Sequence, residues 1–130
     1  MNAFVIDVNL AGFEQDVINK SKLTPVLIDF WAEWCGPCKQ VGPVLEKLAA
    51  DYRGAFILAK VDVDKEQQLA GYFQIRSIPT LMVFREQVIL YSEAGSLPAN
   101  ALDSLIEQVM GLDMAQVHKD IAEQQSQGQA

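Results

Sequence analysis

A nearly continuous apolar run at residues 25–32 limits what this chain can fold into. The run reads Pro-Val-Leu-Ile-Asp-Phe-Trp-Ala, and Asp29 is its single charged residue. A strand without alternation of polar and apolar residues is typical of a position buried on both faces of a sheet. We therefore expect this strand in the middle of a sheet that has helices on both sides.

The remaining segments alternate between strand and helix patterns. Strands are predicted in four further segments, at residues 3–8, 55–63, 80–84 and 88–93. Helices are predicted in four segments, at residues 9–20 with Asn9 as the cap, 36–52, 65–73 and 98–110. Pro43 should kink the second of them. This order predicts an α/β fold in which helices flank both faces of a central mixed sheet.

Length and charge narrow the classes of function. The 130 residues fit one domain with a short appendage. Ten Lys and Arg residues against 17 Asp and Glu residues give a net charge of −7. Nucleic acids and anionic membrane surfaces both require a basic face, so neither is expected as a partner. No apolar run approaches the roughly 18 residues of a membrane span, and no secretory signal is visible, so we expect a cytoplasmic protein.

The character of the chain changes near residue 112. We place one domain at residues 1–111 and a C-terminal extension at residues 112–130. Asp113 can cap a helix with three apolar residues on one face, namely Met114, Val117 and Ile121. This face could dock on the core, on another copy or on a further domain, or the helix could be frayed and solvated. A monomer is the default, and the polar residues after Glu123 are expected to be disordered.

The only two cysteines are separated by Gly36 and Pro37. They directly follow the apolar strand and begin the helix predicted at residues 36–52. At a helix start, free N–H groups and the positive end of the helix dipole favour a thiolate at Cys35. Cys38 lies three residues further, more shielded and within reach of Cys35. We therefore predict Cys35 as the exposed, attacking thiol and Cys38 as the resolving thiol.

Other uses of a cysteine pair fit this spacing less well. A structural disulfide would close only a four-residue loop, worth about 2 kcal/mol, and a reducing cytosol would open it. A zinc site needs four ligands, and the single His118 cannot complete one with two cysteines. Attached haem requires His directly after the second cysteine, where Lys39 stands. A redox-active dithiol, which needs no metal or other cofactor, is the interpretation that remains.

Asp29 and Lys60 are charged residues inside apolar strands. Burial disfavours an ionised carboxylate, so the pKa of Asp29 should rise toward neutrality. Asp29 precedes Cys35 by six residues, so it can lie beneath the dithiol and accept the Cys38 proton through water. Lys60 could pair with Asp29 if their strands are neighbours. The alternatives are a purely structural ion pair, or a lysine that extends to the edge of the sheet.

Three further features point to a surface for a partner. Trp34 stands in the loop before the cysteines. Pro79, between Ile78 and Thr80, precedes a strand, and a cis bond there would shape a tight turn beside an edge that accepts an extended peptide. An ordinary trans loop proline is the alternative. Gly95 permits close backbone approach or a positive φ.

The segment Phe-Trp-Ala-Glu-Trp-Cys-Gly-Pro-Cys-Lys at residues 30–39 resembles the active-site segment of thioredoxins. The resemblance covers about residues 3–111, and Asp29, Lys60, Ile78-Pro79-Thr80 and Gly95 also stand where that family places them. It implies the thioredoxin fold, a cis Ile78–Pro79 bond and dithiol–disulfide exchange. It also implies disulfide-containing proteins as substrates and an NADPH-dependent thioredoxin reductase as the electron donor. The residues implied at the substrate groove are Trp34, Gly36, Pro37, Ile78, Pro79 and Gly95.

Two features depart from the usual thioredoxin pattern. The turn at residues 85–87, Arg-Glu-Gln, lacks an Asn-Gly pair, so an irregular turn is expected. The extension after residue 111, together with residues 66–70, is similar to the thioredoxin domain of bacterial co-chaperones. The leading hypothesis is a protein-disulfide reductase. The alternative is a co-chaperone or holdase domain that acts mainly as a protein-binding module.

Overall fold

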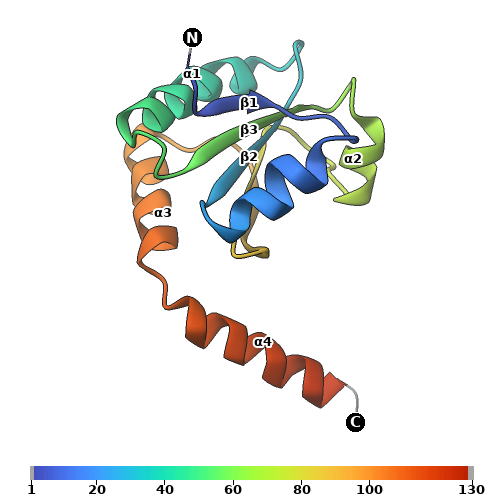
Figure 1. Ribbon diagram of the computed structural model, residues 1–130. Coiled ribbons are helices and arrows are strands. Elements are labelled where there is room, and N and C mark those ends of the chain that lie inside the picture. Colours follow the sequence, from blue (N-terminus) through green and yellow to red (C-terminus); the bar gives the residue numbers. More distant parts are fainter. Residues whose placement is uncertain (1, 129–130) are drawn as a thin grey trace.

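Five strands form one mixed sheet at the centre of the molecule (Figure 1). A computed structural model describes residues 2–128 of the chain. The strands are β1 (Val5–Asp7), β2 (Val26–Trp31), β3 (Ile57–Asp62), β4 (Thr80–Arg85) and β5 (Val88–Ala94). Their spatial order is β1–β3–β2–β4–β5; β3 runs parallel to both β1 and β2, and β4 is antiparallel to both β2 and β5. The apolar run therefore occupies the middle strand, as predicted.

Helices cover both faces of this sheet, which confirms the predicted fold class. The first face packs against α1 (Gly36–Asp51) and α3 (Ala99–Gly111). The opposite face packs against the N-terminal helical segments η1 (Glu14–Asn19) and η2 (Lys20–Lys22), and against α2 (Gln67–Tyr72).

Alternate side chains of β2 pack into two separate hydrophobic cores, one on each face of the sheet. Ile28 and Phe30 belong to the core under η1 and α2. Leu27 belongs to the core under α1 and α3. Because side chains alternate along a strand, Asp29 points to the same side as Leu27, toward α1. The carboxylate is thus placed on the face of the sheet that also carries the helix of the two cysteines.

The N-terminal helix differs from the prediction of a regular helix over residues 9–20. Asn9 Oδ1 accepts a hydrogen bond from Gly12 N at 2.8 Å, as a cap would. The segment that follows forms turns, then the π-helical η1 and the tight 3₁₀ turn η2. Gly12 is a poor helix former, which disfavours a regular first turn. Of the apolar residues expected on one face of this helix, Phe13, Val17 and Ile18 reach the core, whereas Leu10 is exposed.

The β4–β5 turn is tight, whereas an irregular turn was expected. Arg85 pairs with Val88, and the two residues between them, Glu86 and Gln87, have φ values of 51° and 65°. Both positive values match the two-residue turns that favour Asn-Gly. Ser21 supports the strained backbone, because its carbonyl accepts from Glu86 N at 2.7 Å and its hydroxyl from Gln87 N at 3.0 Å. The irregularity of the hairpin is instead a register shift between residues 83 and 84.

The C-terminal extension forms α4 (Met114–Gly128), which extends away from the body of the molecule (Figure 1). Asp113 Oδ1 accepts from Gln116 N at 3.2 Å, so Asp113 caps the helix as predicted. The helix continues over residues 124–128, where disorder was expected, and the three Gln residues of this stretch are good helix formers. Residues 129–130 of the expected tail lie outside the described residues. None of the helices within residues 2–128 has the length and apolar character that crossing a membrane requires.

The base of α4 is anchored to the β4–β5 turn. Arg85 Nη1 donates to the carbonyls of Val109 at 2.7 Å and of Leu112 at 3.3 Å. His118 Nε2 lies 3.0 Å from a carboxylate oxygen of Glu86. Met114 is buried. Of the arrangements left open by the sequence, the structure has the start of this helix docked on the body of the same chain.

Candidate active site

A disulfide joins Cys35 and Cys38 at the start of α1. Cys35 is the N-cap residue, and its Sγ accepts a hydrogen bond from Cys38 N at 3.2 Å. Gly36 and Pro37 form the first turn between them. Proline fits there because its missing N–H would have no intrahelical partner. The reactive sulfur is thus held at the end of the helix where partial positive charge favours a thiolate.

The expected difference in exposure between the two cysteines is absent in this disulfide form. Cys35 is 4% exposed and Cys38 is 3% exposed. The carbonyl oxygen of Ile78 lies 3.8 Å from Cys35 Sγ, so the loop before β4 covers the sulfur that was predicted to face outward. Sequence spacing could not reveal this cover, because the loop is 43 residues away along the chain.

The Ile78–Pro79 peptide bond is cis, as predicted. Thr80 Oγ1 donates to the carbonyl of Ser77 at 2.6 Å, which closes the loop around the proline. Gly95 has a φ of 105°, and its N–H donates to the Pro79 carbonyl at 2.8 Å. Within residues 2–128, no heavy atom beyond its immediate neighbours would lie within 4 Å of a Cβ at Gly95, so the surface there is open to a partner chain.

An open hollow of about 360 Å³ lies beside the disulfide. Its lining residues are Trp34, Val63, Ile75, Arg76, Ser77 and Ile78. Trp34 is 69% exposed, and its Nε1 donates to Asp64 at 2.9 Å, which fixes the indole at the rim. Sequence reasoning missed Val63, Ile75 and Arg76. The position of the latter two, just before Ile78-Pro79, was the only available signal.

Asp29 is completely buried, and neither carboxylate oxygen has a hydrogen-bond partner among the residues that the structure describes. Burial raises the pKa of Asp29 from 3.8 to about 6. The Lys60 ammonium lowers that pKa, and the Glu46 carboxylate raises it further. The direction agrees with the sequence-based expectation. The influence of Glu46 was not foreseen, because only packing of α1 on the sheet brings it near.

Lys60 and Asp29 are register partners in the neighbouring strands β3 and β2. The predicted ion pair between them is nevertheless absent at a distance of 4.0 Å or less among residues 2–128. Lys60 Nζ instead lies 3.7 Å from Glu46 Oε2 and 4.9 Å from the centre of the Trp31 ring. A long lysine side chain can carry its charge away from the dry interior, whereas the short side chain of Asp29 cannot.

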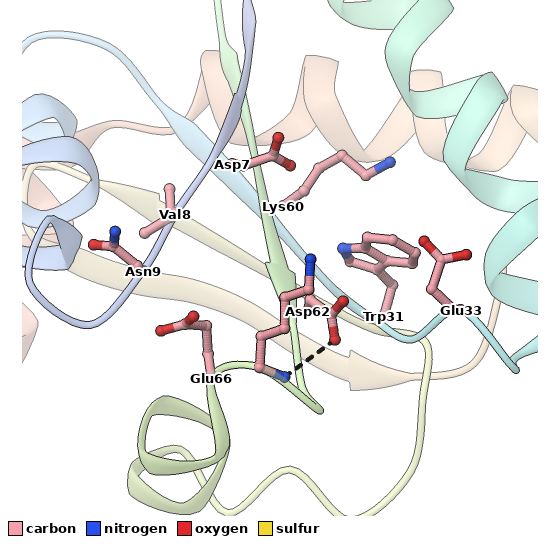
Figure 2. Close-up of a pocket in the computed structure, with 9 residues that line it drawn as sticks. Asp7, Val8, Asn9, Trp31, Glu33, Lys60, Asp62 and Glu66 are labelled. Carbon is pink, nitrogen blue, oxygen red and sulfur yellow. Dashed lines mark hydrogen bonds between the residues drawn. The ribbon is translucent and has the colours of Figure 1, made fainter.

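The Lys60 side chain borders a cavity of about 380 Å³ (Figure 2). The cavity is lined by Asp7, Val8, Asn9, Trp31, Glu33, Lys60, Asp62, Lys65 and Glu66. Seven of these nine residues have polar or charged side chains, so water can occupy the space. Over residues 2–128, no three His, Cys, Asp or Glu side chains are arranged to hold a metal ion.

Comparison with known proteins supports one family. The thioredoxin family model matches residues 4–108. Putative thioredoxin 2 of Streptomyces coelicolor is 48% identical over 122 residues, which cover 94% of this chain and 88% of that protein. Thioredoxin of Pseudomonas aeruginosa is 38% identical over 107 residues, 82% of this chain and 97% of that protein. Thioredoxin of Haemophilus influenzae is 40% identical over 104 residues, which cover 80% of this chain and 95% of that protein.

The Streptomyces relative matches beyond the thioredoxin core. Its match leaves out only about eight of the 130 residues, so it reaches into α4. The Pseudomonas and Haemophilus proteins match shorter stretches and are themselves almost fully covered. Together with the disulfide at the start of α1, these matches show that the chain belongs to the thioredoxin family of thiol–disulfide oxidoreductases.

Proposed function

We propose that this chain reduces protein disulfides in two exchange steps at Cys35 and Cys38. The Cys35 thiolate attacks one sulfur of a target disulfide, and the other target sulfur leaves as a thiolate. Cys38 then attacks Cys35 Sγ, forms the Cys35–Cys38 bond and releases the second target thiolate. Two electrons pass from the dithiol to the target. The observation that carries this proposal is the Cys35–Cys38 disulfide at the N-terminus of α1, beside the open surface at Gly95.

Asp29 is the proposed proton acceptor for the second step. Cys38 must lose its proton before it attacks, and Asp29 lies on the strand that leads into the active-site loop. An unpartnered, buried carboxylate with a pKa of about 6 is a stronger base near neutral pH than an ordinary aspartate. Water would carry the proton between them. Lys60 tunes this base, because its positive charge lowers the pKa of Asp29.

The target is proposed to bind across the surface around the disulfide. Trp34 and Ile78 supply apolar contact area, and both line the hollow next to Cys35. Pro79 and Gly95 present backbone that an extended target segment can approach. Gly36 and Pro37, in the first turn of α1, complete the surface beside the sulfurs.

The dithiol must be regenerated after each cycle. We propose an NADPH-dependent thioredoxin reductase as the donor, so that the chain carries electrons from this enzyme to disulfide-containing proteins. A reductase of this type works in a reducing compartment, which supports a cytoplasmic location. The chain would act as a monomer and without a bound cofactor.

Replacement of Cys38 tests the order of the two steps. A Cys38→Ser variant should still attack target disulfides through Cys35, but it should not release the target protein. Covalent adducts with insulin or another disulfide-containing protein should therefore accumulate. Non-reducing electrophoresis and mass spectrometry would show these adducts, and dithiothreitol should cleave them by reducing the intermolecular disulfide. A Cys35→Ser variant is the matched control and should form none. Adducts through Cys38 in that control would reverse the assigned roles.

A second candidate function is suggested by α4. The helix is anchored at the β4–β5 turn, and a relative matches the chain into this region. A binding module of the co-chaperone type would use this extension for a partner while its dithiol played a minor role. Comparison of the full chain with a version that ends at residue 111 separates the two functions.

A further inference from the structure

Two carboxylates compete for the single ammonium group of Lys60. Glu46 Oε2, on α1, lies 3.7 Å from Lys60 Nζ. Asp29, the register partner of Lys60 on β2, makes no such contact although its carboxylate is buried and unpartnered. The Lys60 ammonium therefore lies nearer to Glu46 than to Asp29. No step of the proposed reaction uses Glu46, whereas the second exchange step uses Asp29.

The local packing explains why the ammonium lies against α1. Gly42 precedes Glu46 by one helical turn, and a Cβ atom at Gly42 would lie 3.9 Å from Lys60 Nζ. The ammonium thus lies against the face of α1 that carries Gly42 and Glu46. On the other side, the Trp31 ring attracts the same cation. The Lys60 side chain is only 18% exposed, so these interactions are screened less than they would be on an open surface.

We propose that Glu46 is a positioning residue for disulfide exchange: it holds Lys60 against α1 and so keeps Asp29 free to accept the Cys38 proton. This inference rests on the proposed role of Asp29 in the second exchange step. Glu46 follows Cys38 by eight residues on α1, and we assign it no contact with the target. Its effect passes through the position of one cation.

The charged groups around Asp29 and Lys60 determine in which direction the pKa of Asp29 shifts when Glu46 is replaced. Lys60 from β3 and Glu46 from α1 act on Asp29, and the β4 neighbour of Asp29, Leu81, is uncharged. Around Lys60, Asp7 is its β1 register partner, and the other charged residues that line the cavity in Figure 2 are Glu33, Asp62, Lys65 and Glu66. These groups remain in every variant below. Removal of the Glu46 charge should lower the pKa of Asp29 directly, and again if Lys60 then turns toward Asp29.

The test is the titration of Asp29 in the disulfide form of the full-length chain, in which neither cysteine titrates, followed by the ¹³C shift of its carboxyl carbon. In Glu46→Gln, we expect the Asp29 midpoint to fall by roughly half a pH unit or more. The control is Asp51→Asn, which removes the same charge from the same helix where Asp51 pairs with Lys47 at the surface. This control should leave the Asp29 midpoint nearly unchanged. An unchanged midpoint in Glu46→Gln would overturn the proposal.

A Lys60→Met background separates positioning from direct repulsion. If Glu46 acts by holding Lys60, the shift caused by Glu46→Gln should shrink clearly when Lys60 is absent. Equal shifts in both backgrounds would mean that Glu46 acts only through its own charge, and this would also overturn the proposal. The acid limb of the pH profile for release of a mixed disulfide should move with the Asp29 midpoint in Glu46→Gln.

The role of Glu46 and the proposed disulfide reduction are tested by different experiments. The carboxyl titration requires no turnover, so it reports on Glu46 and Lys60 alone. Insulin reduction by the wild-type chain reports on the proposed function alone. If the Asp29 midpoint shifts in Glu46→Gln but the pH profile does not move, Glu46 has no role in disulfide exchange. The proposed disulfide reduction itself would be unaffected by that result.

Discussion

Asp29 is the residue at which stability and function conflict most clearly. Its carboxylate is fully buried without a hydrogen-bond partner, and its nearest cation is engaged by Glu46. A buried polar group without partners destabilises the folded state. The protein therefore keeps a group at its core that weakens the fold, which is expected of a group retained for proton transfer.

Replacement of Asp29 by Asn should stabilise the protein in a pH-dependent way. The folded-state pKa of about 6 exceeds the unfolded value of 3.8. Protonation of Asp29 therefore contributes to the free energy of unfolding. This contribution is fully present below pH 3.8 and is lost as the pH rises through about 6, and the loss amounts to about 3 kcal/mol. Urea unfolding of the disulfide form at pH 4 and pH 8 should show a gain for Asp29→Asn that is about 2–3 kcal/mol larger at pH 8. A gain independent of pH would contradict this account.

Asp29 should also set the pH dependence of the second exchange step. Because its pKa lies near 6, the rate of mixed-disulfide release should fall as pH drops through that region. In Asp29→Asn this acid limb should disappear and the rate near pH 7 should fall by about 100-fold, the lower end of the range for a lost general base. Stopped-flow tryptophan fluorescence would measure the rate. A wild-type acid limb preserved in the variant would exclude Asp29 as the base.

The sequence revealed some of these residues and not others. A charge inside an apolar strand identifies Asp29 and Lys60, and the cysteine spacing at a helix start identifies the dithiol. The turn of Lys60 toward Glu46 was not predictable, because it depends on how closely α1 packs on β3 at Gly42. The equal burial of the two cysteines was missed for the same reason, since the covering loop is distant in sequence.

Among the elements, α4 depends on contacts made by the β4–β5 turn. Arg85 donates to carbonyls at the end of α3, and Glu86 contacts His118 on α4. The central strand was predictable from its apolar run, and α1 from its helical periodicity. The tight turn was not, because Ser21, more than sixty residues away, supplies its hydrogen bonds.

An Arg85→Met variant should loosen this end of the molecule. Loss of charge-assisted hydrogen bonds to the carbonyls at the end of α3 should lower the free energy of unfolding by about 1–2 kcal/mol. Amide exchange should increase most in α4 and in the last turn of α3. The matched control is Arg53→Met, because Arg53 is exposed. Equal exchange in both variants would show that Arg85 does not anchor α4.

At the scale of the whole molecule, the dithiol and the extension lie at opposite ends of the sheet. Cys35 follows the last residue of β2, whereas the turn that anchors α4 lies beyond Phe84, which pairs with the first residue of β2. The two parts are therefore separated by the full length of the central strand. We therefore expect the exchange chemistry to be independent of α4.

A version that ends at residue 111 should consequently retain insulin reduction within about twofold. Circular dichroism would verify that it is folded, and the turnover rate would be compared with that of the full chain at equal concentration. A partner that binds the full chain and not the shorter version would assign α4 to partner binding. A folded short version without turnover would contradict the separation of the two ends.

The most direct test of the central claim is the reduction of insulin disulfides in the presence of dithiothreitol. Wild-type protein and Cys35→Ser should be compared at equal concentration, with precipitation of the insulin B chain as the readout. Strong acceleration by the wild-type chain and none by Cys35→Ser is the predicted result. No acceleration by a wild-type chain whose two thiols are shown to be free would contradict the claim that this site is a protein-disulfide reductase.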